Sequence, residues 1–174
     1  NINASENFKI SISENEKKVY DVLDELKISY TCVQHIPVYT IDEVDNLNLD
    51  MKGQHCKNLF TRNKQGNQHY LILVSHTKKA DLKDVAHQIG CSRLSFASEE
   101  RLMRHLGLTP GSVTPFGLLN DSAKHVKVLI DRDFKSCDYI CFHPNVNTAS
   151  VCISFKDFEK FLEWCGNSYQ YITI

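Results

Sequence analysis

The 174-residue sequence lacks the features that direct a chain to a membrane or mark a surface for nucleic acid. No apolar run approaches the ~20 residues that span a bilayer, and the polar start of the chain lacks a basic region followed by an apolar one. The net charge is −1, so no overall positive field attracts nucleic acid, and such contacts would have to come from local patches. We therefore expect a cytoplasmic protein that binds neither membranes nor DNA.

The usual catalytic and metal-binding motifs are also missing. The sequence has no G-x-S-x-G elbow, Walker loop, dinucleotide fingerprint or H-E-x-x-H. Its seven cysteines are an odd number at irregular spacing, which favours reduced thiols over a disulfide framework. Cys137, Cys141, His143 and Cys152 could be read as zinc ligands, but they contain no C-x2-C pair, and cysteines in strands are usually small buried apolar residues. We predict no metal and no cofactor.

The chain contains enough apolar residues, 42% of the total, to form the core of one domain. We expect a single domain over residues 1–174. Helical spacing with capping residues alternates with short strand patterns. The fold class that follows is α/β or α+β with a mixed, partly antiparallel sheet. The expected helices are 14–27, a short one from Thr40, 82–89, 99–106 and 155–165, and the expected strands are 28–33, 55–61, 69–75, 93–96, 125–131, 139–142, 151–153 and 171–174.

One stretch, LGLTPGSVTPFGLLND at 106–121, fits neither a helix nor a plain strand. Its prolines fix φ and lack an N–H, and its glycines permit backbone conformations closed to other residues, so we expect a shaped loop. Such a loop can point backbone N–H groups and the hydroxyls of Ser112 and Thr114 at a small polar ligand. The alternative is an ordinary turn between a helix and a strand, which is the commoner use of glycine and proline.

Two further polar segments have equally ordinary alternatives. Lys57, followed by Asn58, lies near the start of a strand, where a solvated lysine is typical, although the apolar residues after it would place it close to the edge of the core. His143 ends another strand because Pro144 follows it, and a histidine at the rim of a sheet usually forms only local hydrogen bonds.

Taken in order, KNLF at 57–60, the loop at 106–121 and FHPN at 142–145, with Asn147 after it, resemble the YbaK/ProX superfamily of aminoacyl-tRNA editing domains. They are most similar to the free-standing ProX branch, also called the prolyl-tRNA synthetase associated domain. The likeness covers nearly the whole chain. It implies a mixed, barrel-like sheet flanked by helices and an enzyme that hydrolyses alanine wrongly esterified to proline tRNA.

The resemblance also implies roles for individual residues. Lys57 matches the essential lysine, an electrostatic clamp for the terminal phosphate or ester, and Gly111 belongs to a G-x-x-x-P loop whose N–H groups position the ester and stabilise its oxyanion. The tRNA's own 2′-hydroxyl is implied to assist the water. The substrate-binding residues are expected to be Asn58, Ser112, Val113, Thr114, Pro115, His143 and Asn145.

The implied partners are the acceptor end of proline tRNA and prolyl-tRNA synthetase, with Arg62, Lys64, Lys78 and Lys79 as candidate phosphate contacts or, equally, solvated surface charges. Three alternatives remain. The chain could remove cysteine, serine or threonine from a mischarged tRNA, it could be a non-catalytic module that binds tRNA or a synthetase, or it could be a zinc-dependent or thiol hydrolase.

Overall fold

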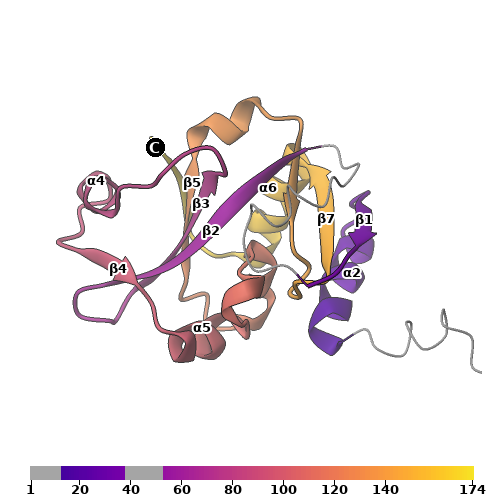
Figure 1. Cartoon of the computed structure of the whole chain (residues 1–174), viewed down its shortest axis with the longest axis horizontal. Coiled ribbons are helices and arrows are strands. Elements are labelled where there is room, and N and C mark those ends of the chain that lie inside the picture. The colour runs from indigo at the N-terminus through magenta and orange to yellow at the C-terminus, as the bar shows by residue number, and fades with distance from the viewer. Residues whose placement is uncertain (1–12, 38–52) are drawn as a thin grey trace, which may run out of the picture.

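The sheet that organises the molecule is mixed and has eight strands in the computed structural model, which describes residues 13–37 and 53–174. The hydrogen-bonded order is β1-β7-β6-β2-β3-β5-β8, and β4 pairs with the far end of β2. In Figure 1 the long strand β2 crosses the molecule diagonally, with α4 and β4 towards one end and β1, β7 and α2 towards the other. The strands are β1 (Thr31–Gln34), β2 (Gln54–Asn63), β3 (His69–Ser75), β4 (Leu94–Phe96), β5 (Lys127–Asp131), β6 (Tyr139–Phe142), β7 (Ala149–Ser154) and β8 (Tyr169–Ile172).

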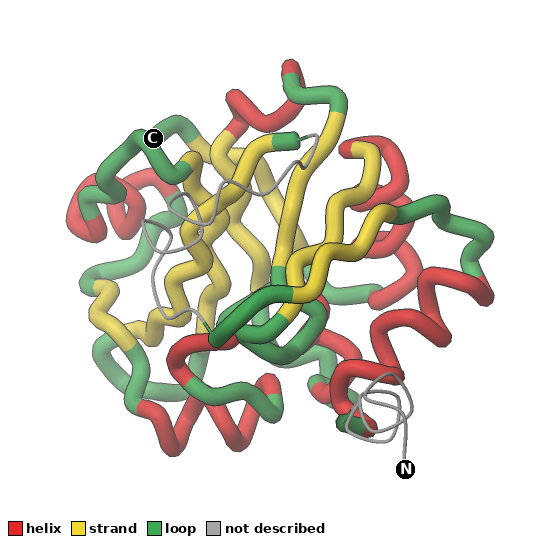
Figure 2. Tube along the Cα trace, turned by 45° about the vertical axis from the view of Figure 1, so that its right-hand side comes forward, coloured by secondary structure: helices red, strands yellow, loops and turns green. Residues whose placement is uncertain are grey.

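The sheet combines parallel and antiparallel pairs of strands. The neighbours β1/β7, β7/β6, β2/β3 and β2/β4 are antiparallel, whereas β6/β2, β3/β5 and β5/β8 are parallel. Figure 2 shows the strands in the middle of the molecule with helices around them. The predicted mixed sheet flanked by helices is therefore confirmed. The helices are α2 (Glu14–Glu25), α4 (Leu82–Gln88), α5 (Glu99–Leu106) and α6 (Phe155–Cys165), and the 3-10 helices are η1 (Pro110–Ser112), η2 (Pro115–Asn120) and η3 (Arg132–Ser136).

The helices begin where the capping patterns predicted. The side chains of Ser13, Asp81, Ser98 and Ser154 each accept a hydrogen bond from a backbone N–H in the first turn of the helix that follows. These bonds satisfy N–H groups that have no partner inside the helix. Two helices, α5 and α6, end at a glycine with positive φ, as the sequence also suggested.

Two strands are displaced from their predicted positions, and one predicted helix cannot be assessed. The strand expected at 28–33 is β1 at Thr31–Gln34, because the turn that closes α2 continues to Ile28: Lys27 has a φ of 56° and the Ile28 N–H donates to the Leu23 carbonyl. The strand expected at 171–174 is β8, which begins two residues earlier. The short helix expected from Thr40 lies outside the described residues.

Two hydrophobic clusters stabilise the fold. The larger one lies between one side of the sheet and α2, α5 and α6, and includes Phe60, Phe116, Phe142 and Phe158. The smaller one is formed mainly by α4, β4 and the facing residues of β3, β5 and β8. Burying each aromatic ring of the larger cluster contributes roughly 1.5–3 kcal/mol.

The prediction of reduced thiols is wrong for one pair of cysteines. Cys141 and Cys152 face each other across β6 and β7 and form a disulfide. Direct opposition in an antiparallel pair brings Cβ atoms within disulfide reach, and the strand register that produces it is not visible in cysteine spacing. Cys56 and Cys165 are buried free thiols, as the apolar interpretation of strand and helix cysteines expected.

Candidate active site

The segment from Leu106 to Asp121 forms a compact, mostly buried loop built from two 3-10 helices. Gly111 lies in η1, and the Ser112 N–H donates to the Thr109 carbonyl at 2.9 Å. Thr114 is fully buried and caps η2, because its hydroxyl accepts a hydrogen bond from the Phe116 N–H at 3.4 Å. The Thr114 hydroxyl therefore shapes the loop from within, whereas the sequence had suggested that it faces a ligand.

Aromatic packing fixes this loop to the main core. The Phe116 ring meets those of Phe142 and Phe161 edge to face, with centroids 5.8 and 5.2 Å away. Gly117 allows this seating, since a Cβ at that position would lie 2.6 Å from Leu108 Cδ1 and 3.2 Å from the Leu106 carbonyl oxygen. Glycine is thus required at 117 because Leu106 and Leu108 pack closely against the backbone there, and not because of a positive φ.

Asn15, the second residue of α2, connects the loop to the segment that follows β6. Its Nδ2 donates to the Gly107 carbonyl at 3.0 Å, and its Oδ1 accepts from Asn120 Nδ2 at 3.0 Å. The buried Asn145, at a φ of 62°, donates its Nδ2 to the Asn15 carbonyl and Oδ1 at 3.1 and 3.2 Å. Two of the three predicted motifs are therefore brought together by a residue that the sequence did not single out.

The third motif lies on β2, next to β6. The parallel register pairs Gln54 with Ile140 and His55 with Cys141, which places the following residues, Lys57 and Asn58, beside the end of β6. Neighbouring residues of a strand point to opposite faces. Lys57 Nζ donates to the Lys78 carbonyl after β3, whereas Asn58 lies on the face of Cys56 and the main core.

The side-chain oxygen of Asn58 is buried and can still accept a hydrogen bond. Its Nδ2 donates to the Cys56 carbonyl at 3.4 Å, but Oδ1 has no hydrogen-bond partner in the described part of the chain. A buried amide oxygen without a partner costs about 1–3 kcal/mol. An acceptor of this kind suits a hydroxyl or N–H of a ligand.

His143 lies immediately after β6 with a defined proton position. Its Nδ1 lies 2.8 Å from the Ala149 carbonyl, which can only accept, so Nδ1 carries the proton and Nε2 has a free lone pair. Burial lowers the pKa of His143, and the positive charges that His35 and His55 can carry lower it further. The ring of His35 lies 6.1 Å away, edge on. His35 and His55 thus lie near His143, although neither was among the predicted site residues.

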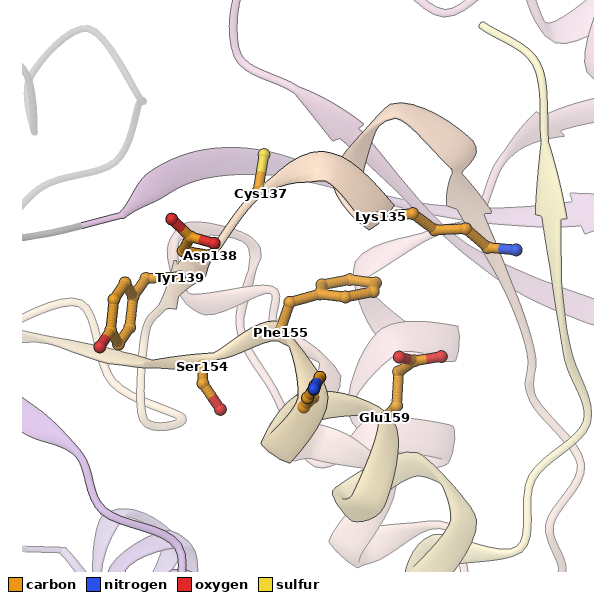
Figure 3. A pocket seen from close by; sticks show the side chains of 8 residues that line it. Lys135, Cys137, Asp138, Tyr139, Ser154, Phe155 and Glu159 are labelled. Atoms are coloured by element: carbon orange, nitrogen blue, oxygen red, sulfur yellow. The ribbon is translucent and has the colours of Figure 1, made fainter.

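A hollow in the described part of the chain lies apart from the predicted residues. A hollow of about 650 Å³ lies at the other end of the β6/β7 hairpin, where Tyr139 pairs with Ser154, and Figure 3 shows the side chains of Lys135, Phe155 and Glu159 around it. The register puts His143 beyond the opposite end of the same hairpin. This hollow is therefore separate from the candidate active site.

One of the predicted phosphate contacts is already neutralised. Lys78 Nζ lies 2.8 Å from Asp131 and 2.5 Å from Asp133, and these bonds raise its pKa. Arg62 donates to the carbonyls of its own turn, at Asn63 and Lys64. The predicted role of Lys78 in binding phosphate is not supported by this geometry, because a phosphate would have to displace two carboxylates.

These features together are compatible with a hydrolase that acts on esters by holding the substrate and stabilising charge. The site offers an ammonium, a shaped backbone loop, an unpaired amide oxygen and a neutral imidazole. These groups suit binding of a polar ester and stabilisation of the negative charge that forms on its carbonyl oxygen.

The comparisons with known proteins define the family. The model of the aminoacyl-tRNA editing domain family matches residues 35–161, and the chain belongs to this family of aminoacyl-tRNA deacylases. It is 43% identical over 152 residues to the prolyl-tRNA editing protein ProX of Acetoanaerobium sticklandii, covering 87% of this chain and 93% of that protein. It is 31% identical over 159 residues to the mouse prolyl-tRNA synthetase associated domain-containing protein 1, covering 89% and 94% of the two chains.

A solved structure described as a candidate trans-editing enzyme for prolyl tRNA synthetase has the same fold. The TM-score is 0.71 at 20% identity, and the alignment covers 94% of this chain and 98% of the other. The chain is thus an editing hydrolase of the YbaK/ProX type, and this family implies binding of a mischarged tRNA. No helix in the described ranges 13–37 and 53–174 is long and apolar enough to cross a membrane.

Proposed function

We propose that this chain, acting as one domain over residues 1–174, hydrolyses alanine from mischarged proline tRNA in the cytoplasm, in trans to prolyl-tRNA synthetase. The observation that carries the proposal is the 43% identity to the prolyl-tRNA editing protein ProX over most of both chains. The physical need is clear, because a pocket that accepts proline cannot strongly reject the smaller alanine: one missing methylene costs only ~1–3 kcal/mol. A second site that admits only small residues supplies the missing discrimination.

In the proposed reaction a water oxygen attacks the ester carbonyl carbon, and the bond from that carbon to the ribose oxygen breaks. The ribose oxygen takes up a proton and leaves as the free hydroxyl, so that alanine and uncharged tRNA are released. The tRNA's own 2′-hydroxyl assists the water, as the resemblance implies. The protein's part is to hold the ester and to stabilise the oxyanion.

The residues divide this work between binding and stabilisation. Lys57 Nζ exchanges the Lys78 carbonyl for a phosphate of the tRNA 3′ end, and the free Oδ1 of Asn58 accepts from the terminal nucleoside. In the loop, the Ser112 N–H is occupied by Thr109, so the N–H groups of Gly111 and Val113 are the proposed oxyanion donors.

The other predicted binding residues shape the pocket. His143, neutral and held by Ala149, bounds the space for the amino acid. Pro115 and Thr114 are buried in the loop and set its path. Asn145 keeps the segment after β6 against the loop through Asn15.

The decisive experiment follows release of labelled amino acid from proline tRNA charged separately with alanine, cysteine, serine and proline. We expect fast release of alanine and slow release of the others. Faster release of cysteine or serine would replace the alanine assignment with another deacylase specificity, and no release at all would favour a non-catalytic tRNA-binding module.

The same assay tests Lys57. We expect Lys57→Ala to reduce alanine release by about 100-fold or more, the size of effect seen when one charge-stabilising group is removed, while far-UV circular dichroism stays unchanged. Lys83→Ala, at an exposed position of α4, is the matched control and should retain full activity. A folded Lys57→Ala protein with undiminished activity would remove the lysine from the mechanism.

A further inference from the structure

Three histidines from distant parts of the chain meet at the end of the sheet away from Lys57. His69 begins β3, His105 lies in the last turn of α5, and His125 precedes β5. The β2/β3 register pairs Arg62 with His69 but Lys57 with Val74, so this cluster lies at the opposite end of the hairpin from Lys57, next to the two ends of the loop at 106–121. The proposed deacylation makes no use of it.

The three imidazoles are close enough to share one ligand. His69 Nδ1 and His125 Nε2 are 2.8 Å apart, and the His105 ring stacks on that of His125 with centroids 4.7 Å apart at 18°. One ring nitrogen from each residue lies within 4.8 Å of the other two. Ligands of a tetrahedral zinc ion, at about 2.0–2.1 Å from the metal, are separated by roughly 3.3 Å. To bind one ion, the nitrogens must move closer, and the stacked His105 and His125 rings must turn so that the lone pair of each, which lies in the ring plane, points at the ion.

The surroundings fix the cluster in place. Asp121 accepts hydrogen bonds from the backbone N–H groups of His125 and Val126 at 3.2 and 2.8 Å, and Asn167 donates to the same carboxylate at 2.9 Å. On the other side the Phe60 ring stacks on His69 at 5.4 Å. His69 is 1% exposed, so one ligand is buried while the other two are partly open to solvent.

We propose that His69, His105 and His125 form a binding site for a divalent transition-metal ion of the zinc class. Three neutral imidazoles with no thiolate or carboxylate in the set suit Zn²⁺, Cu²⁺ or Ni²⁺ rather than Mg²⁺ or Ca²⁺. Three protein ligands leave a fourth position for water. Because the ligands come from β3, α5 and the start of β5, a bound ion would cross-link three elements and stabilise the fold.

Arg101 opposes this binding and provides a specific test of it. Its Nη1 lies 3.2 Å from His69 Nε2 and, having only donors, must donate there. The proton of neutral His69 then lies on Nδ1, which donates to His125. For Nδ1 to bind a metal, this proton must move to Nε2 and the Arg101 hydrogen bond must break. Removing the guanidinium should therefore strengthen metal binding.

The two arginines beside the cluster do not make it an anion site. Arg62 donates through Nε and Nη2 to the carbonyls of Asn63 and Lys64, and Arg101 Nη1 also donates to the Gly66 carbonyl. These donors hold the β2/β3 turn, whereas one ring nitrogen of each histidine lies within 4.8 Å of those of the other two.

The experiment uses the full chain after removal of metal with a chelator. Zn²⁺ and Co²⁺ are titrated separately, with the melting temperature and the visible absorption of Co²⁺ as readouts. We expect Zn²⁺ to raise the melting temperature and one equivalent of Co²⁺ to give the bands of a four-coordinate site without thiolate charge transfer. The thiolate band matters because free cysteines elsewhere in the chain also bind these ions.

Variants identify the ligands. His105→Ala and His125→Gln should each lower Zn²⁺ affinity at least about tenfold, since even outer-shell changes cost that much, whereas His87→Ala on exposed α4 should not. Arg101→Leu should raise the affinity. The proposal is overturned if binding is absent, if it survives both histidine changes, if it carries thiolate bands, or if inorganic phosphate stabilises the protein and the metals do not.

Discussion

At Gly117 the loop leaves no room for a side chain. We expect Gly117→Ala to destabilise the protein by ~1–3 kcal/mol, because its Cβ would lie 2.6 Å from Leu108 Cδ1 and overpacking of this kind has that cost. Urea unfolding measures the loss. In a double-mutant cycle with Leu108→Ala the two changes should be less than additive, since the second removes the clashing atoms. If the two losses of stability were strictly additive, the alanine side chain at 117 would not be in contact with Leu108.

His143 should make stability depend on pH. Burial lowers its folded pKa below the ordinary ~6.5, so as the pH falls the unfolded chain takes up the proton first. The contribution of His143 is therefore complete above about pH 6.5 and is lost as the pH falls towards the lowered value. Urea unfolding at about pH 7.5 and about pH 5.5 should show a smaller loss for His143→Gln than for wild type.

His87→Gln, at an exposed position of α4, is the control for this measurement and should leave the pH dependence unchanged. If His143→Gln loses as much stability as the wild type when the pH is lowered, burial of His143 is not a source of the pH dependence.

Predictions from sequence are weakest at the level of single residues. Lys57, Asn58 and His143 were selected because they match a family motif, and their assigned roles stay predictions. The sequence could not indicate that Asn58 Oδ1 lacks a partner or that Lys57 donates to Lys78, because both depend on the register of strands and on a loop after β3. The histidine cluster was missed altogether, since its members are 20 or more residues apart and form no local spacing pattern.

Among the elements, α2 has a role that its amphipathic pattern does not suggest. Its apolar side fills the core, but its first turn also connects the loop at 106–121 with Asn145. The hydrogen bonds from Asn120 and Asn145 to Asn15 span 105 and 130 residues. Contacts of such separation leave no signal in one sequence, whereas helix caps are encoded within a few residues and were predicted correctly.

Asn15→Ala tests this connection. It removes the acceptor of two buried or half-buried amides, so we expect a loss of ~1–3 kcal/mol in the free energy of unfolding and, because the loop loses its tie to Asn145, a lower rate of alanine release. Unfolding curves and the charged-tRNA assay measure the two effects. Lys17→Ala, exposed on the same helix, is the matched control. Equal behaviour of the two variants would contradict the connecting role of Asn15.

For the molecule as a whole, the disulfide between β6 and β7 makes stability depend on redox conditions. It closes a loop of 11 residues, which corresponds to about 3 kcal/mol in the chain-entropy model. Reductant should therefore lower the melting temperature by roughly 6–12 °C. In a reducing cytoplasm this contribution would be absent.

The control for the redox effect is the double variant Cys141→Ser/Cys152→Ser, whose melting temperature should not respond to reductant. A wild-type protein equally indifferent to reductant would show that the disulfide contributes nothing to its stability.

The connection made by Asn15 also bears on where the folding unit ends. The family match begins at residue 35 and stops at 161, so it leaves out α2, β1, the last turn of α6 and β8, the strand that pairs with β5. A protein trimmed to those limits would keep every predicted catalytic residue yet lose the helix that joins two of the motifs. The stretch that the family model matches is thus shorter than the folded unit that α2 and β8 help to form.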